Sequence, residues 1–154
     1  MPNMKWSELN KNQLGQYGEY YTKMEFASYG WDIYTSEVDD HGVDFVAKDV
    51  KTCEFFEIQV KSIRPGSYAF IYKDKISLDA HHLVCFLYFI DGELPKVYII
   101  PATVWENPNA VFVEHNYDKP GQTSKPEWGI NYSNKNLPLL DKYKSEKFFE
   151  ECGK

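Results

Sequence analysis

The sequence lacks any segment long and apolar enough to cross a membrane. Its longest apolar run, Leu83 to Ile90, is far shorter than the roughly 20 residues that span a bilayer, and the N-terminal residues contain no apolar signal-peptide core. Cysteine is scarce, with three widely spaced residues and no CxxC pattern. Neither a disulfide framework nor a zinc knuckle is therefore indicated. These absences predict a soluble, cytoplasmic protein with reduced cysteines.

Features of several enzyme and repeat classes are missing as well. The chain contains no internal repeat, no glycine-rich phosphate loop and no nucleophile elbow. Its adjacent histidines, His81 and His82, would point in different directions on a strand or on a helix, so a shared metal ion is not expected there. The function must be sought in other patterns.

An excess of positive charge is also absent. The formal net charge is -6, which disfavours a nucleic-acid partner because proteins that bind phosphates usually carry a basic surface. A metal-dependent nuclease nevertheless needs clustered carboxylates, and local patches are what contact a DNA backbone. Solvated surface lysines are the other explanation for the one basic stretch, which comprises Lys61, Arg64, Lys73 and Lys75.

Apolar sequence sufficient for one core is present. With 154 residues, of which 43% are hydrophobic, we expect a single domain over residues 1–154. A proline-free stretch from about Ser7 to Tyr29 ends at Gly30 and predicts a first helix. Its expected apolar stripe is Leu14, Tyr17, Tyr21 and Met24.

Short apolar runs after this helix predict strands. The first three indicate a meander, and the last two, joined by a turn at residues 91–93, indicate buried central strands. With a helix at each end, the order of elements predicts an α/β sandwich. The expected strands are Trp31–Val38, Val43–Lys48, Phe55–Ile63, Tyr68–Tyr72, Leu83–Ile90 and Lys96–Ala102, with a turn at residues 39–42, a loop at residues 118–126 and a final helix at Pro138–Cys152.

Residues 57–61 carry a pattern with chemical meaning. Because side chains alternate along a strand, Ile58 and Val60 share an apolar face. The polar face carries Glu57, Gln59 and Lys61. A half-exposed antiparallel strand gives the same alternation, so this pattern does not decide the function by itself.

An acidic residue upstream adds to the pattern. Asp44 follows Gly42 at the start of an apolar run, which places it one strand away from Gln59. Two neighbouring strands can hold a carboxylate, an amide oxygen and an ammonium close together, as a hard divalent cation and a phosphate require. An ordinary aspartate at a turn is the alternative interpretation of Asp44.

The order of these motifs resembles that of the PD-(D/E)XK nuclease superfamily, in its restriction-type and resolvase-like branch, where glutamine often replaces the last glutamate. The resemblance covers Gly15 to Ser62 and implies a restriction-endonuclease-like α/β fold, with a central mixed β-sheet flanked by helices. The motifs that carry it are Gly18-Glu19, Gly30-Trp31, Gly42-Val43-Asp44 and Ile58-Gln59-Val60-Lys61-Ser62.

The resemblance also implies an activity, the metal-dependent hydrolysis of DNA phosphodiester bonds by an endonuclease. Mg²⁺ or Mn²⁺ would bind to Asp44, Gln59 and Glu19, and Lys61 would orient water or neutralise charge in the transition state. These four residues form the expected catalytic site, with Ser62 just outside the metal ligands. DNA is the implied partner, while a homodimer and a protein partner both stay open.

The sequence departs from the family pattern at three points. No proline precedes Asp44, Gln59 replaces a carboxylate, and Glu19 falls opposite the expected apolar stripe of its helix. Glu57 is an alternative source of the missing charge, and a surface glutamate is the alternative for Glu19. A second hypothesis therefore stays open, in which a catalytically inactive nuclease fold acts as a binding or inhibitory module.

Overall fold

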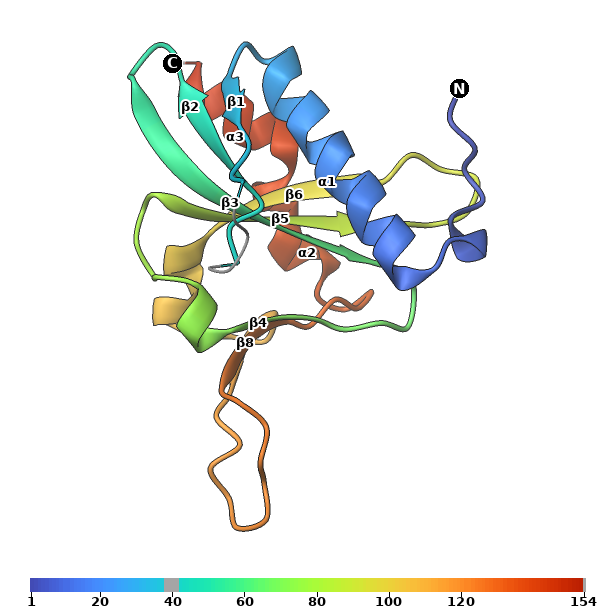
Figure 1. Cartoon of the computed structure of the whole chain (residues 1–154). Coiled ribbons are helices and arrows are strands. Elements are labelled where there is room, and N and C mark those ends of the chain that lie inside the picture. Colours follow the sequence, from blue (N-terminus) through green and yellow to red (C-terminus); the bar gives the residue numbers. More distant parts are fainter. Residues whose placement is uncertain (38–41, 154) are drawn as a thin grey trace.

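The computed structural model describes residues 1–37 and 42–153, which form two β-sheets and several helices (Figure 1). The larger sheet contains β1 (Asp32–Tyr34), β2 (Phe45–Asp49), β3 (Glu54–Ile63), β5 (His82–Tyr88) and β6 (Lys96–Pro101), and the smaller contains β4 (Ala69–Tyr72), β8 (Glu127–Ile130) and β7 (Phe112–His115). The helices are α1 (Lys11–Ser28), α2 (Leu137–Leu140) and α3 (Ser145–Cys152), and the 3-10 helices are η1 (Trp6–Glu8), η2 (Lys73–Lys75), η3 (Ala102–Glu106) and η4 (Asp141–Tyr143).

The larger sheet is mixed. Its strand order is β1-β2-β3-β5-β6, and β1, β2 and β3 form the predicted antiparallel meander. β3 pairs with β5 in parallel. A parallel pair needs a crossover, and the chain through β4 and η2 provides it by returning to the end of the sheet at which β3 begins. The predicted fold class, a central mixed sheet flanked by helices, is confirmed.

The two faces of this sheet bury different partners. α1 crosses one face (Figure 1), where its Leu14 and Phe26 pack with Phe149 of α3 and with Ile58 of β3. The opposite face packs against the smaller sheet and against Leu140 of α2. Successive residues of β3 therefore face either α1 or the second sheet.

The second sheet was not predicted as a unit. The sequence indicated β4 alone, because β7 and β8 are only four residues each and lack a long apolar run. The predicted loop at residues 118–126 is confirmed as the connection between β7 and β8, a hairpin that projects from the body of the molecule (Figure 1). Trp105 of η3 holds this sheet to the core, since its ring is 1% exposed and its Nε1 donates to the Gly129 carbonyl at 3.1 Å.

The first helix begins later than predicted. Asn10 and Gln13 form a capping box, in which each side chain accepts a hydrogen bond from the other residue's backbone N–H, at 2.8 and 2.9 Å. The α-helix consequently begins at Lys11, and the predicted helical start near Ser7 belongs to η1. The predicted stripe was wrong at Met24, which is 58% exposed. The buried positions of α1 are Leu14, Gly18, Thr22 and Phe26.

The tail and one early turn complete the comparison with the sequence. The predicted helix Pro138–Cys152 is divided into α2, η4 and α3, because Lys144 has an extended backbone, with ψ 141°, before α3. The end of the predicted strand Trp31–Val38 and most of the predicted turn at residues 39–42 lie outside the described residues. No helix within the described part of the chain is long and apolar enough to span a bilayer.

Candidate functional site

Asp44 lies where β2 and β3 begin to separate. Its backbone N–H donates to the Ile58 carbonyl at 2.9 Å, and its Oδ2 accepts from the Val60 N–H at 2.7 Å. The paired register of the two strands starts at Phe45 and Ile58, so the Asp44 carboxylate takes the place of a backbone carbonyl opposite Val60. This bond holds the carboxylate at the opening between the strands.

The backbone of Val60 adds a polar group at the same opening. The N–H and C=O of one residue in a strand point to the same edge. Since the Val60 N–H points to Asp44, its carbonyl also points toward the side of β2. The opening therefore combines a carboxylate with a backbone carbonyl.

Gln59 and Lys61 lie on the face of β3 that is turned toward the second sheet. Gln59 is 4% exposed, and its Nε2 donates to the Lys75 carbonyl at 2.6 Å. Because that bond occupies the amino group, the Oε1 acceptor points away from the Lys75 carbonyl. Burial lowers the pKa of the Lys61 ammonium, an effect that Asp44 opposes and Lys11 increases.

These side chains line one pocket of about 400 Å³ where β3 of the larger sheet meets β4, an edge strand of the smaller sheet. The larger sheet contributes the carboxylate of Asp44, the amide of Gln59 and the ammonium of Lys61, and β4 contributes an aromatic wall. A larger hollow of about 540 Å³ adjoins it at Lys75, and the contact between Glu57 and His82 lies in its lining. The remaining residues that line the smaller pocket are Gly42, Val60, Phe70, Ile71, Tyr72 and Lys75.

The backbone two residues before Asp44 requires a glycine, Gly42. Its φ is +81°, a conformation that other residues rarely adopt. A Cβ at this position would lie 3.1 Å from the Lys75 Cβ, 3.2 Å from its carbonyl oxygen and 3.5 Å from Gln59 Nε2. The glycine thus lets the chain pass close over the hydrogen bond between Gln59 and Lys75.

Two other expected site residues lie elsewhere. Glu19 of α1 pairs with Lys23 one turn later, at 3.1 Å, and is not among the residues that line the pocket. Ser62 faces α1 instead of the pocket, because it follows Lys61 on an alternating strand, and its Oγ lies where a Cβ on Gly18 would be only 1.9 Å away. Sequence reasoning had no signal for the parts played by the Lys75 carbonyl or by Phe70 and Tyr72.

The donors that do converge suit a hard divalent cation. Mg²⁺ usually keeps several waters and takes one or two carboxylates from the protein, and the pocket offers one carboxylate, from Asp44, with the Gln59 and Val60 carbonyl oxygens beside it. No cluster of three or more His, Cys, Asp or Glu side chains able to hold a metal ion occurs in residues 1–37 and 42–153. The arrangement therefore favours weak metal binding that a phosphate ligand would strengthen.

Comparison with known proteins supports the fold. No protein-family model matches the sequence, and neither does any curated protein. A bacterial homing endonuclease, I-Ssp6803I, matches the structure with a TM-score of 0.52 at 15% identity, over 94% of this chain and 96% of that chain. Hjc, a Holliday junction resolvase from the archaeal hyperthermophile Archaeoglobus fulgidus, matches with a TM-score of 0.48 at 12% identity, over 81% and 88% of the two chains. The first likeness shows that this chain has a restriction-endonuclease-like fold.

Proposed function

We propose that this protein is a metal-dependent endonuclease that hydrolyses phosphodiester bonds in DNA. The observation that carries the proposal is the meeting of Asp44, Gln59 and Lys61 in one pocket. Oxygen donors beside a half-buried ammonium suit a divalent cation and a phosphodiester at the same time. The fold shared with a homing endonuclease adds support by analogy.

Asp44 and the Oε1 of Gln59 would hold Mg²⁺ or Mn²⁺, with the Val60 carbonyl as a further donor. When bound, the cation supplies Lewis acidity toward the phosphoryl oxygen and toward water. The hydrogen bond from Val60 to Asp44 and the bond from Gln59 to Lys75 keep both donors in place without reorganisation. Glu19, which pairs with Lys23 and does not line the pocket, is left out of the proposed ligand set.

Lys61 would stabilise the negative charge that develops on the phosphoryl group. The lowered pKa means that burial of the ammonium outweighs its attraction to Asp44. A phosphodiester that enters the pocket would supply the missing negative charge. Because the ammonium is half-buried, its interaction with that charge is less screened than that of a fully exposed lysine.

A second candidate function is supported by the small number of acids. Glu19 and Glu57 are paired with Lys23 and His82, so Asp44 is the one acid among the described residues that line the pocket. A catalytically inactive nuclease fold that binds or inhibits a partner would also have few carboxylates. Activity assays decide between the two functions.

The test compares nicking of a supercoiled plasmid with Mg²⁺, with Mn²⁺ and with EDTA. We expect nicking only with a divalent cation, and a loss of roughly 100-fold or more in Asp44→Asn. Asn at this position keeps an acceptor for the Val60 N–H, so the variant should fold. Asp32→Asn, at an exposed position of β1, is the control and should cut normally. Binding of Mn²⁺ through Asp44 without cleavage of plasmid or branched DNA would favour the second function.

A further inference from the structure

We infer that the outer face of the second sheet is a stacking surface for unpaired bases, so that the substrate of the Asp44 site is DNA with a single-stranded segment. This inference rests on the proposed function and names its substrate class. It is carried by a row of aromatic side chains beside the pocket. We call this row, which consists of Tyr68, Phe70 and Tyr72, the aromatic row.

The aromatic row follows one side of β4. Because side chains alternate along a strand, the three rings share a face, while Ala69 and Ile71 between them are buried in the core. Neighbouring ring centroids are 6.1 and 5.4 Å apart. Tyr68 is 42% exposed and Tyr72 38% exposed. The rings of Tyr68 and Tyr72 are therefore presented to solvent, and the half-buried ring of Phe70 lies between them, nearly parallel to Tyr68 and edge-to-face with Tyr72.

The first ring of the row packs closely against β8. A Cβ at Gly129 of β8 would lie 1.7 Å from the Tyr68 hydroxyl, so the glycine leaves room for the ring to lie across the strand. Burial and the neighbouring carboxylate of Glu127, which is itself 6% exposed, raise the pKa of the Tyr68 hydroxyl. The close approach of Tyr68 to Gly129 packs this end of the ring against β8, and a ring ordered in advance loses little entropy when a base stacks on it.

The row is continuous with the candidate active site. Phe70 and Tyr72 line the same pocket as Asp44 and Lys61. At the other end, Tyr68 lines an adjoining hollow of about 320 Å³ together with basic side chains of Lys11 and Arg64. A strand lying along the row would pass directly over the pocket.

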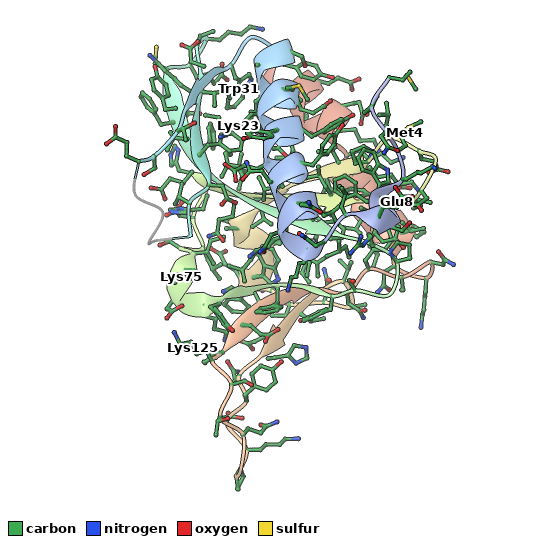
Figure 2. The ribbon with its side chains drawn as sticks, turned by 45° about the vertical axis from the view of Figure 1, so that its right-hand side comes forward. Met4, Glu8, Lys23, Trp31, Lys75 and Lys125 are labelled. Carbon is green, nitrogen blue, oxygen red and sulfur yellow. The ribbon has the colours of Figure 1, made fainter. Side chains whose placement is uncertain are left out.

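Basic side chains accompany the row along its length. The Nζ of Lys125 lies 5.6 Å from the centre of the Tyr72 ring, and Figure 2 shows Lys75 and Lys125 on the same side of the molecule, at the junction of the body and the projecting hairpin. Lys61 lies in the pocket between these ends. Aromatic faces interleaved with lysines are what sequence-tolerant binding of a single strand requires.

A duplex cannot use such a surface, because its base faces are already stacked inside the helix. Flat sheets that bind RNA use the same device, with aromatic residues of a sheet face stacking on successive unpaired bases. The chemistry therefore favours a flap, a fork or a bubble over a fully paired segment. The phosphate to be cut would lie next to the bases that stack on Phe70 and Tyr72.

The experiment measures the binding of a fluorescent thymine-only strand and of a duplex of the same length by anisotropy, in EDTA so that no cleavage takes place. We expect the single strand to bind more tightly. Tyr72→Ala should weaken single-strand binding about fivefold or more and leave duplex binding unchanged. The control is Tyr20→Ala, which removes a tyrosine that is 58% exposed on α1 and should change neither. Phe70→Ala provides a second variant of the row.

The outcomes separate this inference from the proposed function. If paired and unpaired DNA bind equally, Tyr72→Ala has no effect and the plasmid is still nicked through Asp44, the stacking surface is wrong and the endonuclease stands. If the single strand binds through Tyr72 but no DNA of any form is cut with Mg²⁺ or Mn²⁺, the endonuclease is wrong and the substrate assignment falls with it. If Tyr72→Ala converts an oligomer into a monomer without affecting DNA binding, the row is a contact between copies and the inference is overturned.

Discussion

The side chain at position 59 donates a hydrogen bond that a carboxylate could not donate. Gln59 is almost fully buried, and its Nε2 donates to the Lys75 carbonyl at 2.6 Å. A glutamate at this position would place two acceptors against each other, and a buried acceptor without a donor costs about 1–3 kcal/mol. The glutamine is thus a consequence of how η2 packs on β3.

Gln59→Glu should have opposite effects with and without metal. In EDTA we expect a loss of about 1–3 kcal/mol in the free energy of unfolding, because the hydrogen bond to Lys75 is lost and a second carboxylate lies near Asp44. With Mg²⁺ the variant should gain more stability than the parent, because a hard cation prefers a carboxylate to an amide oxygen. Thermal melts with and without the ion measure both effects. Gln16→Glu on the exposed side of α1 is the control, and an equal response of both variants would mean that Gln59 is not a ligand.

Lys61 should be unfavourable for stability and favourable for activity. Burial lowers the pKa of Lys61 in the folded state. At pH values between the folded and the unfolded pKa of Lys61, the unfolded chain therefore binds more protons than the folded one. The stability penalty is fully present below the folded value and disappears as the pH rises through that interval. Lys61→Met should therefore be more stable than the parent at neutral pH, with a difference that shrinks as the pH approaches the ordinary lysine value.

Cleavage by Lys61→Met should fall roughly 100-fold, which is opposite in sign to its effect on stability. Urea denaturation at several pH values and plasmid nicking check the two effects. Lys147→Met, at an exposed position of α3, is the matched control and should change neither. If Lys61→Met cuts DNA normally, Lys61 is an ordinary half-buried lysine.

Two glycines of α1 differ in what surrounds them, although both lie within the same helix. A Cβ at Gly18 would be 1.9 Å from Ser62 Oγ and 3.2 Å from Ser62 Cβ, whereas a Cβ at Gly15 would meet nothing within 4 Å. Gly18 therefore sets how closely α1 approaches β3. Gly15 serves no packing purpose in the structure.

The two alanine substitutions should change stability in opposite directions. Gly15→Ala should raise the free energy of unfolding by about 0.5–1 kcal/mol, because alanine is the better helix former. Gly18→Ala should lower it by about 1–3 kcal/mol, because the helix must move away from β3. Urea denaturation measures both. If Gly18→Ala were as stable as Gly15→Ala, the close contact between α1 and β3 would have to be wrong.

The elements that the sequence predicted are those whose own residues define them. The meander and the two buried strands β5 and β6 follow from long apolar or alternating runs, and the structure confirms them. The predicted central place was right for β5 and wrong for β6, which is an edge strand of the larger sheet. The buried face of α1 was less readable because Gly18 and Thr22, which are not large apolar residues, lie against the sheet. β7 and β8 were missed because four residues carry too little periodicity.

The candidate site shows the same difference between residues that are close in the sequence, which could be predicted, and residues brought to the site by packing, which could not. Asp44, Gln59 and Lys61 lie within one short meander, so the resemblance was able to predict their roles, which still await test. The Lys75 carbonyl and the aromatic wall come from the crossover chain after β3, and their place at the pocket depends on how the second sheet packs. The net charge of -6 was equally uninformative, because it does not show where the lysines of the chain lie. Their place beside the pocket depends on the fold.

If DNA binding depends on both sheets, a substitution that loosens the second sheet should weaken DNA binding more than an equally destabilising substitution elsewhere. Two tryptophans allow a matched test, because Trp105 and Trp6 are each 1% exposed and each donates from Nε1 to a backbone carbonyl, of Gly129 and of Glu93, at 3.1 and 2.8 Å. Replacing either ring by phenylalanine removes that bond and leaves a small void, which should cost about 1–3 kcal/mol of stability. Trp105 anchors the sheet that carries the aromatic row, whereas Trp6 packs beside α1 on the other face. We therefore expect Trp105→Phe to raise KM for DNA cleavage while Trp6→Phe leaves KM unchanged, although urea denaturation should show similar losses of stability.

An equal rise in KM for both variants would mean that DNA binding follows overall stability and that the second sheet has no separate role in DNA binding.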